Sequence, residues 1–241
     1  MPDPKRIAEN LARVRGDIAD AAAKAGRRPE DVRLVVVTKS AGVPDILALV
    51  GLGQTLLAEN RVQALQERAA AVAAAPGTAA VRWHMIGHLQ RNKVKAVLPL
   101  VEMVHSLDSL RLAEEISKRA AADPAANPVR VLLEVNVSGE DSKEGVSVAE
   151  APALAEQVAA LPGVRLCGLM TMAPYEAEPE ETRPVFAGLR ALHGRIRDRL
   201  DSAGPEAAAA FTELSMGMSN DYPVAVQEGA TLVRVGTALF E

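Results

Sequence analysis

Short apolar runs recur along almost the whole chain, and stretches with the spacing of amphipathic helices separate them. The runs are rich in β-branched residues and alternate poorly between polar and apolar positions, which is typical of strands buried on both faces. Such strands are usually parallel, because helices cover both sides of the sheet. We expect strands at residues 34–37, 55–58, 83–86, 103–106, 131–135, 166–170, 211–214 and 232–235.

The alternation of strands and helices constrains the fold class. A helix at about residues 4–25 is expected before the first strand. Strands that are each followed by a helix or by the terminus predict an α/β protein, a single (β/α)8 TIM barrel, which needs about 250 residues. The 241 residues of the chain meet this requirement, and without a long linker we expect one domain over residues 1–241. An open, doubly wound sheet is the alternative, because alternation alone does not show closure. The main helices are expected at 61–74, 109–121, 147–160 and 179–200.

Charge and cysteine content narrow the function classes. The chain has 27 Lys and Arg against 31 Asp and Glu, so it lacks the basic excess that nucleic acids or anionic membranes attract. A single cysteine, Cys167, cannot form an internal disulfide and is expected to be an inert core thiol. No signal peptide is evident, and no apolar run approaches the ~18 residues of a membrane span. We therefore expect a cytoplasmic protein that handles a small molecule.

A barrel places its functional residues at the C-terminal ends of its strands. The first predicted strand ends in Thr38-Lys39, where a lysine is an unusual choice for packing alone. Partial desolvation there would lower the pKa of Lys39 and free the neutral amine that attacks a carbonyl. From this residue alone, an equally consistent interpretation is that the side chain extends into solvent.

The last two predicted strands suggest an anion site. Arg234 lies in apolar sequence, and Gly236 and Thr237 follow it with an amide and a hydroxyl that phosphate oxygens can approach. The small residues of segment 215–219 would let further backbone amides converge there. Barrel closure makes the first and last strands neighbours, so Lys39 and this cradle would suit a phosphorylated aldehyde bound as an imine.

Other patterns are weaker. His84 and His88 are four residues apart, as on a zinc-binding helix, but Met85 replaces the glutamate of H-E-x-x-H and the segment is a predicted strand. We therefore expect no metal site. Three acidic residues at or after predicted strands would suit glycoside hydrolysis, although sequence does not give the separation that this chemistry requires. They are Glu59, Asp108 and Glu134.

Five segments resemble the pyridoxal phosphate homeostasis protein family (YggS/PROSC-like), which is similar in fold to the N-terminal barrel of alanine racemase. The resemblance runs in order over about residues 5–240, and its most specific parts are Trp-His-x-Ile-Gly and Ser-Met-Gly-Met-Ser. The segments are 34–40, 59–63, 83–93, 214–221 and 233–237.

The resemblance implies a site for pyridoxal 5′-phosphate, a form of vitamin B6. Lys39 would carry the cofactor as a Schiff base, and Arg234 would face its pyridine nitrogen. The residues implied to hold the phosphate are Ser215, Gly236 and Thr237. Those implied to lie near the ring and its substituents are Asn60 and His84.

The arginine also bears on catalysis. A permanent cation opposite the pyridine nitrogen disfavours protonation there, which makes the ring a weak electron sink. A racemase also needs a second proton carrier. In the racemase family a tyrosine of a C-terminal β-domain serves this purpose, whereas this chain has only Tyr175 and Tyr222, both within the barrel region.

The leading hypothesis is therefore a non-catalytic protein that stores, buffers or delivers pyridoxal phosphate. The alternatives are a pyridoxal phosphate-dependent amino-acid racemase and a Schiff-base aldolase. A third hypothesis is an inert barrel that acts through partners. Expected partners are the cofactor and apo-forms of the enzymes that use it, with the chain a monomer or a weak homodimer.

Overall fold

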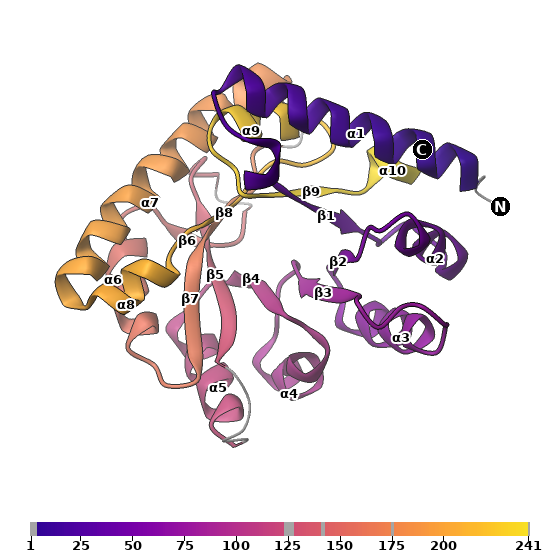
Figure 1. Cartoon of the computed structure of the whole chain (residues 1–241). Coiled ribbons are helices and arrows are strands. Elements are labelled where there is room, and N and C mark those ends of the chain that lie inside the picture. Colours follow the sequence, from indigo (N-terminus) through magenta and orange to yellow (C-terminus); the bar gives the residue numbers. More distant parts are fainter. Residues whose placement is uncertain (1–3, 123–127, 141–142, 175, 241) are drawn as a thin grey trace.

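The computed structural model describes residues 4–122, 128–140, 143–174 and 176–240. Within these residues, eight parallel strands form a closed ring in the order β1-β2-β3-β4-β5-β7-β8-β9, and β9 returns to β1 (Figure 1). The closed ring confirms the predicted (β/α)8 barrel and contradicts the open doubly wound sheet. The barrel strands are β1 (Arg33–Val37), β2 (Leu56–Glu59), β3 (Arg82–Met85), β4 (Met103–Leu107), β5 (Val129–Asn136), β7 (Val164–Met170), β8 (Glu213–Ser215) and β9 (Leu232–Val235).

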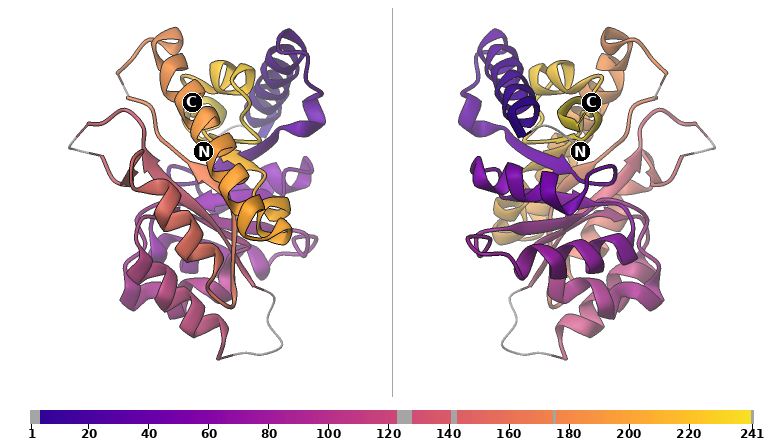
Figure 2. Two further views of the ribbon diagram at one scale, coloured as in Figure 1. Left: turned by 90° about the vertical axis from the view of Figure 1, so that its left-hand side faces the viewer. Right: turned by 90° about the vertical axis from the view of Figure 1, so that its right-hand side faces the viewer.

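Helices surround the ring, as the two side views show (Figure 2). A short strand, β6 (Val146–Ser147), pairs with β5 outside the ring. The helices are α1 (Pro4–Lys24), α2 (Val43–Gly51), α3 (Val62–Ala73), α4 (Val94–Val97), α5 (Leu110–Ala120), α6 (Ala151–Ala159), α7 (Arg183–Ala203), α8 (Pro205–Ala210), α9 (Tyr222–Gln227) and α10 (Thr237–Phe240).

The strands are apolar on both faces because each face packs against a different core. In β1, Leu34 and Val36 contact the layer between barrel and helices, whereas Val35 points to the barrel interior. This arrangement explains why the strand sequences alternate so poorly. The interior cluster also contains Cys167, which is buried as expected.

Ion pairs gather at the N-terminal ends of the strands. Glu213 accepts from Arg33 at 2.5 Å and lies 3.5 Å from Arg130. Glu102 pairs with Arg130 at 2.8 Å and with Arg82 at 3.3 Å. Polar residues at this end of a barrel generally serve stability, whereas functional residues gather at the opposite end.

The predicted N-terminal helix is α1, which packs against α9 and α10 beside the last strand (Figures 1 and 2). Tyr222 of α9 donates from its hydroxyl to Asp17 of α1 at 2.5 Å. Arg13 donates to the carbonyl oxygen of Ala238 at 2.8 Å. These contacts join the start of the chain to its last βα unit.

Two predicted elements begin later than expected, each for a local reason. Ser147 and Glu150 form a reciprocal contact, with Ser147 Oγ donating to Glu150 Oε2 at 2.6 Å and Glu150 N donating back to Ser147 Oγ at 3.2 Å. Helix α6 nevertheless begins at Ala151, because Ser147 pairs with β5 as part of β6. Phe211 was predicted to start a strand but caps the end of α8, so β8 begins at Glu213.

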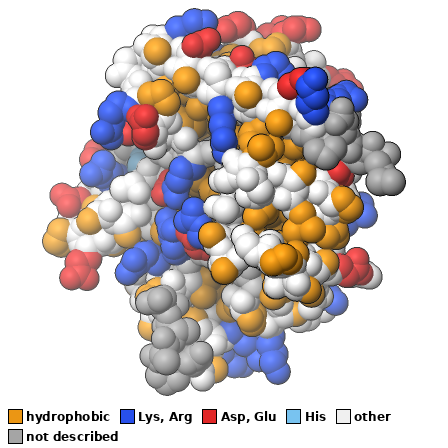
Figure 3. Space-filling model, turned by 45° about the vertical axis from the view of Figure 1, so that its right-hand side comes forward, with side chains coloured by type: hydrophobic (Ala, Val, Ile, Leu, Met, Phe, Trp, Pro, Cys, Tyr) orange, Lys and Arg blue, Asp and Glu red, His pale blue; other side chains and the backbone are white. Residues whose placement is uncertain are grey.

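The surface carries charges of both signs. The face drawn in Figure 3 carries both basic and acidic side chains, and several Lys and Arg side chains lie close together near its centre. Of the helices in the described part of the chain, none combines the length and apolar character that a membrane crossing requires.

Candidate functional site

The turn after β1 holds Lys39 by its backbone. Thr38 is fully buried and bonds through its hydroxyl to Glu59 at the end of β2. Arg68 of α3 donates to Glu59 as well, and it also donates to the carbonyl oxygens of Lys39 at 3.3 Å and Ala41 at 3.1 Å. The lysine backbone is therefore anchored to two neighbouring elements.

The Lys39 side chain is exposed, because it lies in a turn beyond the end of the strand. The partial desolvation predicted from the apolar sequence before it is therefore wrong for this structure. Among described residues, its amine has no hydrogen bond or ion pair, so it is available to an electrophile.

Arg234 of β9 is a buried cation inside the barrel, with 4% of its surface exposed. Its Nη1 donates to Ser215 Oγ at 2.6 Å, and its Nη2 donates to the carbonyl oxygen of Thr171 at 2.9 Å. Burial lowers the pKa of Arg234 to about 10, although the nearby carboxyls of Glu134 and Asp221 oppose this shift. The guanidinium thus remains charged at neutral pH.

Two histidines extend this hydrogen-bond chain across the interior. His105 Nδ1 lies 2.9 Å from Ser215 Oγ, and His105 Nε2 lies 2.8 Å from His84 Nδ1. Burial lowers the pKa of His84 to about 3 and that of His105 well below its usual value, so both rings are neutral.

Which group donates in each of these hydrogen bonds follows from Arg234, because a guanidinium can only donate. If Ser215 donates to His105 Nδ1, then His105 donates from Nε2 to His84 Nδ1 and every group but one is paired. The remaining group is His84 Nε2, which is buried without a partner among described residues. The opposite direction would also leave the Ser215 proton without an acceptor, so we assign the first.

A second group of residues surrounds the amide of Gly236. Ser219 Oγ accepts from the Gly236 N–H at 3.3 Å and from the Ala238 N–H at 3.2 Å. A Cβ at Gly236 would lie 2.9 Å from the carbonyl oxygen of Val37, so only glycine lets this backbone approach β1 so closely. Thr237 follows at the exposed start of α10. This cradle lies beside the end of the strand that leads to Lys39.

The structure differs from the expectation for Ser215. Its hydroxyl is fully buried and engaged with Arg234 and His105, whereas Ser219 stands beside Gly236. The sequence places both serines in one small-residue segment. It could not show which of them faces the interior and which faces the Gly236 amide.

Asn60 follows β2 on the C-terminal side of the barrel. Its carbonyl oxygen would lie 2.1 Å from a Cβ at position 87, so Gly87 is required for this close packing. A small cavity of about 280 Å³ adjoins it. The residues that line this cavity are Asn60, Arg61, Val62, His88, Gln90 and Lys93.

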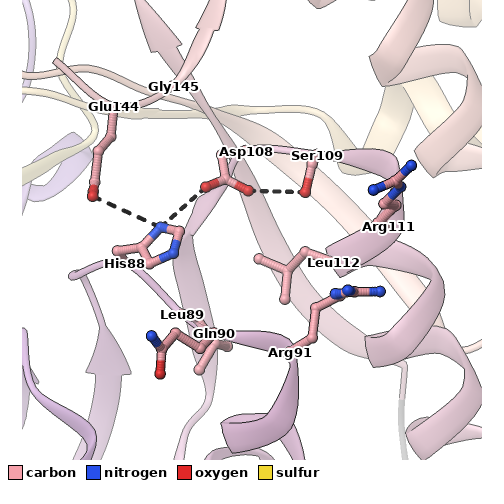
Figure 4. Close-up of a pocket in the computed structure, with 10 residues that line it drawn as sticks. All are labelled: His88, Leu89, Gln90, Arg91, Asp108, Ser109, Arg111, Leu112, Glu144 and Gly145. Atoms are coloured by element: carbon pink, nitrogen blue, oxygen red, sulfur yellow. Dashed lines mark hydrogen bonds and ion pairs between the residues drawn. The ribbon is translucent and has the colours of Figure 1, made fainter. Parts of the chain in front are cut away.

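A larger cavity of about 580 Å³ lies beside the first and shares His88 and Gln90 with it (Figure 4). His88 Nδ1 lies 3.1 Å from Asp108 Oδ2 and 3.8 Å from Glu144 Oε1. Neither cavity was apparent from the sequence. The lining residues are His88, Leu89, Gln90, Arg91, Asp108, Ser109, Arg111, Leu112, Glu144 and Gly145.

The three candidate carboxyls do not form one site. Glu59 is held by Thr38 and Arg68, whereas Asp108 lines the larger cavity. Glu134 of β5 is buried near Asp108, and burial together with the acidic side chains nearby raises its pKa to about 7. Asp108 is one of the acidic side chains that contribute to the raised pKa of Glu134.

Comparison with known proteins places this barrel in a family. Residues 5–241 match the alanine racemase N-terminal domain. The pyridoxal phosphate homeostasis protein of Aquifex aeolicus is 41% identical over 232 residues, with 96% of each chain covered. That of Pseudomonas aeruginosa is 39% identical over 97% of this chain and 94% of its own. The chain belongs to the pyridoxal phosphate homeostasis protein family.

Solved structures agree with this assignment. PipY of Synechococcus elongatus, a member of the family solved with pyridoxal phosphate bound, is 32% identical with a TM-score of 0.80, covering 98% of this chain and 100% of PipY. A protein of unknown function from Bifidobacterium adolescentis is 39% identical with a TM-score of 0.85, covering 98% and 95%. Alanine racemase of Corynebacterium glutamicum, at 14% identity and a TM-score of 0.68, shares the fold alone over 60% of its chain.

Proposed function

We propose that this chain binds pyridoxal 5′-phosphate on Lys39 and serves to store, buffer or deliver it inside the cell. When bound, this group supplies an aldehyde that condenses with an amine and releases water. The observation that carries the proposal is the free amine of Lys39. The backbone of this lysine is anchored just beyond the end of β1, beside the cradle at Gly236. The cofactor held by PipY supports it.

The residues near Lys39 fit the two ends of such a molecule. The Ser219 and Thr237 hydroxyls can donate hydrogen bonds to phosphate oxygens, and the Gly236 amide can exchange its long 3.3 Å bond to Ser219 Oγ for one to the phosphate. Arg234 offers a buried cation that cannot accept a proton, and we place it at the pyridine nitrogen. In this proposal Ser219 replaces Ser215 as the phosphate contact, and Ser215 holds Arg234.

Asn60 and His84 remain proposed neighbours of the ring. Asn60 lies at the end of the strand next to β1, and its side chain forms no hydrogen bond with a described residue. His84 carries the unpaired Nε2–H assigned above, which is free to donate to an acceptor.

We propose further that the protein is not a racemase. Arg234 lowers the tendency of the ring nitrogen to bind a proton, which weakens the stabilisation of a carbanion. Tyr222 donates to Asp17 between α9 and α1, outside the barrel, and Tyr175 lies outside the described residues. Incubation of an amino acid with the protein in deuterium oxide should give no multiple-turnover exchange at the α-carbon. Such exchange would contradict the non-catalytic assignment.

The remaining features of the proposal concern the context in which the protein acts. We propose that residues 1–241 act as one domain in the cytoplasm, as a monomer or weak homodimer. Apo-forms of enzymes that require pyridoxal phosphate are the proposed recipients. Mixing the loaded protein with such an apo-enzyme and following its recovery of activity tests delivery.

A further inference from the structure

The larger cavity has an anionic wall and a cationic wall. Figure 4 shows His88, Asp108 and Glu144 on one side, and Arg91 and Arg111 on the other. The carboxylates of Asp108 and Glu144 both face the same ring nitrogen of His88, at 3.1 and 3.8 Å. One ring nitrogen offers at most one N–H, so it cannot satisfy both carboxylates fully.

The arginines of the cationic wall are available to a ligand. In the described part of the chain, neither guanidinium forms a hydrogen bond or a close ion pair, although Arg91 lies within electrostatic range of Glu115. Arg91 comes from the turn after β3, and Arg111 from the first turn of α5. A guanidinium binds a carboxylate through two parallel hydrogen bonds, so this wall suits a carboxylate.

Glu134 adds a third carboxyl behind the anionic wall. Gly145, which lines the cavity, packs directly against it, since a Cβ there would lie 3.0 Å from Glu134 Cγ. The charged groups that act on Glu134 are Glu144, Asp108 and, with opposite sign, Arg234. Burial, reinforced by the negative charge of Glu144 and Asp108, raises the pKa of Glu134 to about 7.

We propose that this cavity binds a free amino acid, with its ammonium group at Asp108 and Glu144 and its carboxylate at Arg91 and Arg111. A metal ion suits the site less well, because the described residues contain no group of three side chains arranged to hold one. A purely anionic ligand would meet the two carboxylates. The volume of about 580 Å³ lies within the range of small-molecule sites, roughly 300–1,000 Å³.

Calorimetric titration with alanine, glutamate and phenylalanine tests this proposal, with the N-acetyl derivative and the amide of each as matched probes. At least one free amino acid should bind, and removal of its ammonium or carboxylate charge should weaken binding about tenfold or more. The proposal is overturned if no free amino acid binds at about 10 mM, or if the N-acetyl form binds equally well.

Variants locate the binding. Affinity for the amino acid should fall about tenfold in each of three cavity variants, Asp108→Asn, Arg111→Gln and Glu144→Gln, the last at an exposed position. The control Arg195→Gln, on α7, should leave the affinity unchanged. Equal affinity in all of them would exclude this cavity. Lys39→Ala should bind the amino acid normally. Lys39→Ala removes the residue proposed to hold the cofactor and leaves the cavity unchanged. If this variant loses the cofactor but still binds the amino acid, the two sites are independent.

Discussion

Arg234 Nη1 donates to the Ser215 hydroxyl at 2.6 Å, deep inside the barrel. Because the guanidinium can only donate, it fixes the direction of the hydrogen bonds that run on through His105 to His84. One buried cation on β9 thereby orders polar groups on three other strands. The first two predictions separate this interior network from the cradle at Gly236.

Ser219→Ala should weaken binding of pyridoxal phosphate about tenfold to a hundredfold, because a hydrogen bond to a charged group contributes roughly 1.5–3 kcal/mol. The hydroxyl of Ser219 also accepts from the amides of Gly236 and Ala238, which are partly buried, so we expect a loss of stability smaller than that of Ser215→Ala. Equilibrium dialysis of the apo-protein measures the affinity. An unchanged affinity would remove Ser219 from the phosphate site.

Ser215→Ala should mainly lower the stability of the protein and have the smaller effect on its affinity for pyridoxal phosphate. It leaves part of a buried guanidinium and His105 without a partner, which should lower the free energy of unfolding by about 1–3 kcal/mol. Urea titration of the apo-protein measures this loss. If Ser215→Ala is as stable as the natural sequence while Ser219→Ala is not, the roles assigned to the two serines are reversed.

Glu134 should make the protein less stable as pH rises. Its pKa is raised to about 7 in the fold, whereas in the unfolded chain it returns to the ordinary value of 4.5. Between these values the folded state holds a proton that the unfolded state has lost, so stability falls by roughly 3 kcal/mol across the window.

Glu134→Gln, which stays neutral, should therefore gain stability relative to the natural sequence between pH 4.5 and pH 8. The exposed substitution Glu206→Gln on α8 is the control. Urea titrations at several pH values give the comparison. A constant difference between the Glu134 variant and the natural sequence would show that Glu134 is ionised throughout.

His193 should make the protein less stable as pH falls, which is the opposite of the effect of Glu134. His193 stacks on Phe211 with ring centroids 4.6 Å apart, and burial lowers its pKa to about 4. The unfolded chain binds the proton first as pH falls below 6.5, so this part of the stability is lost between about pH 6.5 and 4.

His193→Phe keeps the stacked ring and removes the titrating group. The protein should therefore take up about one proton fewer on unfolding, which reduces the loss of stability as pH falls. Arg195→Gln, at an exposed position of the same helix α7, is the control. The slope of unfolding free energy against pH, compared at pH 7, 6 and 5, measures the change. Identical slopes for His193→Phe and the natural sequence would contradict the assignment.

The fold was predictable from sequence because strand burial on both faces leaves a clear periodic pattern. The position of Lys39 was predictable for the same reason, since it lies two residues after the end of a strand. The exposure of its side chain was not, because one residue separates the buried Thr38 from the exposed Lys39.

Side-chain partners from distant strands were also beyond sequence reasoning. The contact between His84 and His105 joins β3 and β4, and neither residue stands in a motif that suggests a pair. The choice between Ser215 and Ser219 depends on how segment 215–219 bends against Gly236, which residue type alone does not encode.

The central claim is that Lys39 holds pyridoxal phosphate covalently. The loaded protein should be reduced with borohydride, digested and analysed by mass spectrometry, with Lys39→Ala and Lys93→Ala treated in parallel. We predict one adduct, on the peptide that contains Lys39, present in the natural sequence and Lys93→Ala and absent from Lys39→Ala. An equal yield of covalent cofactor in Lys39→Ala, or an adduct on another lysine in the natural sequence, would contradict the account.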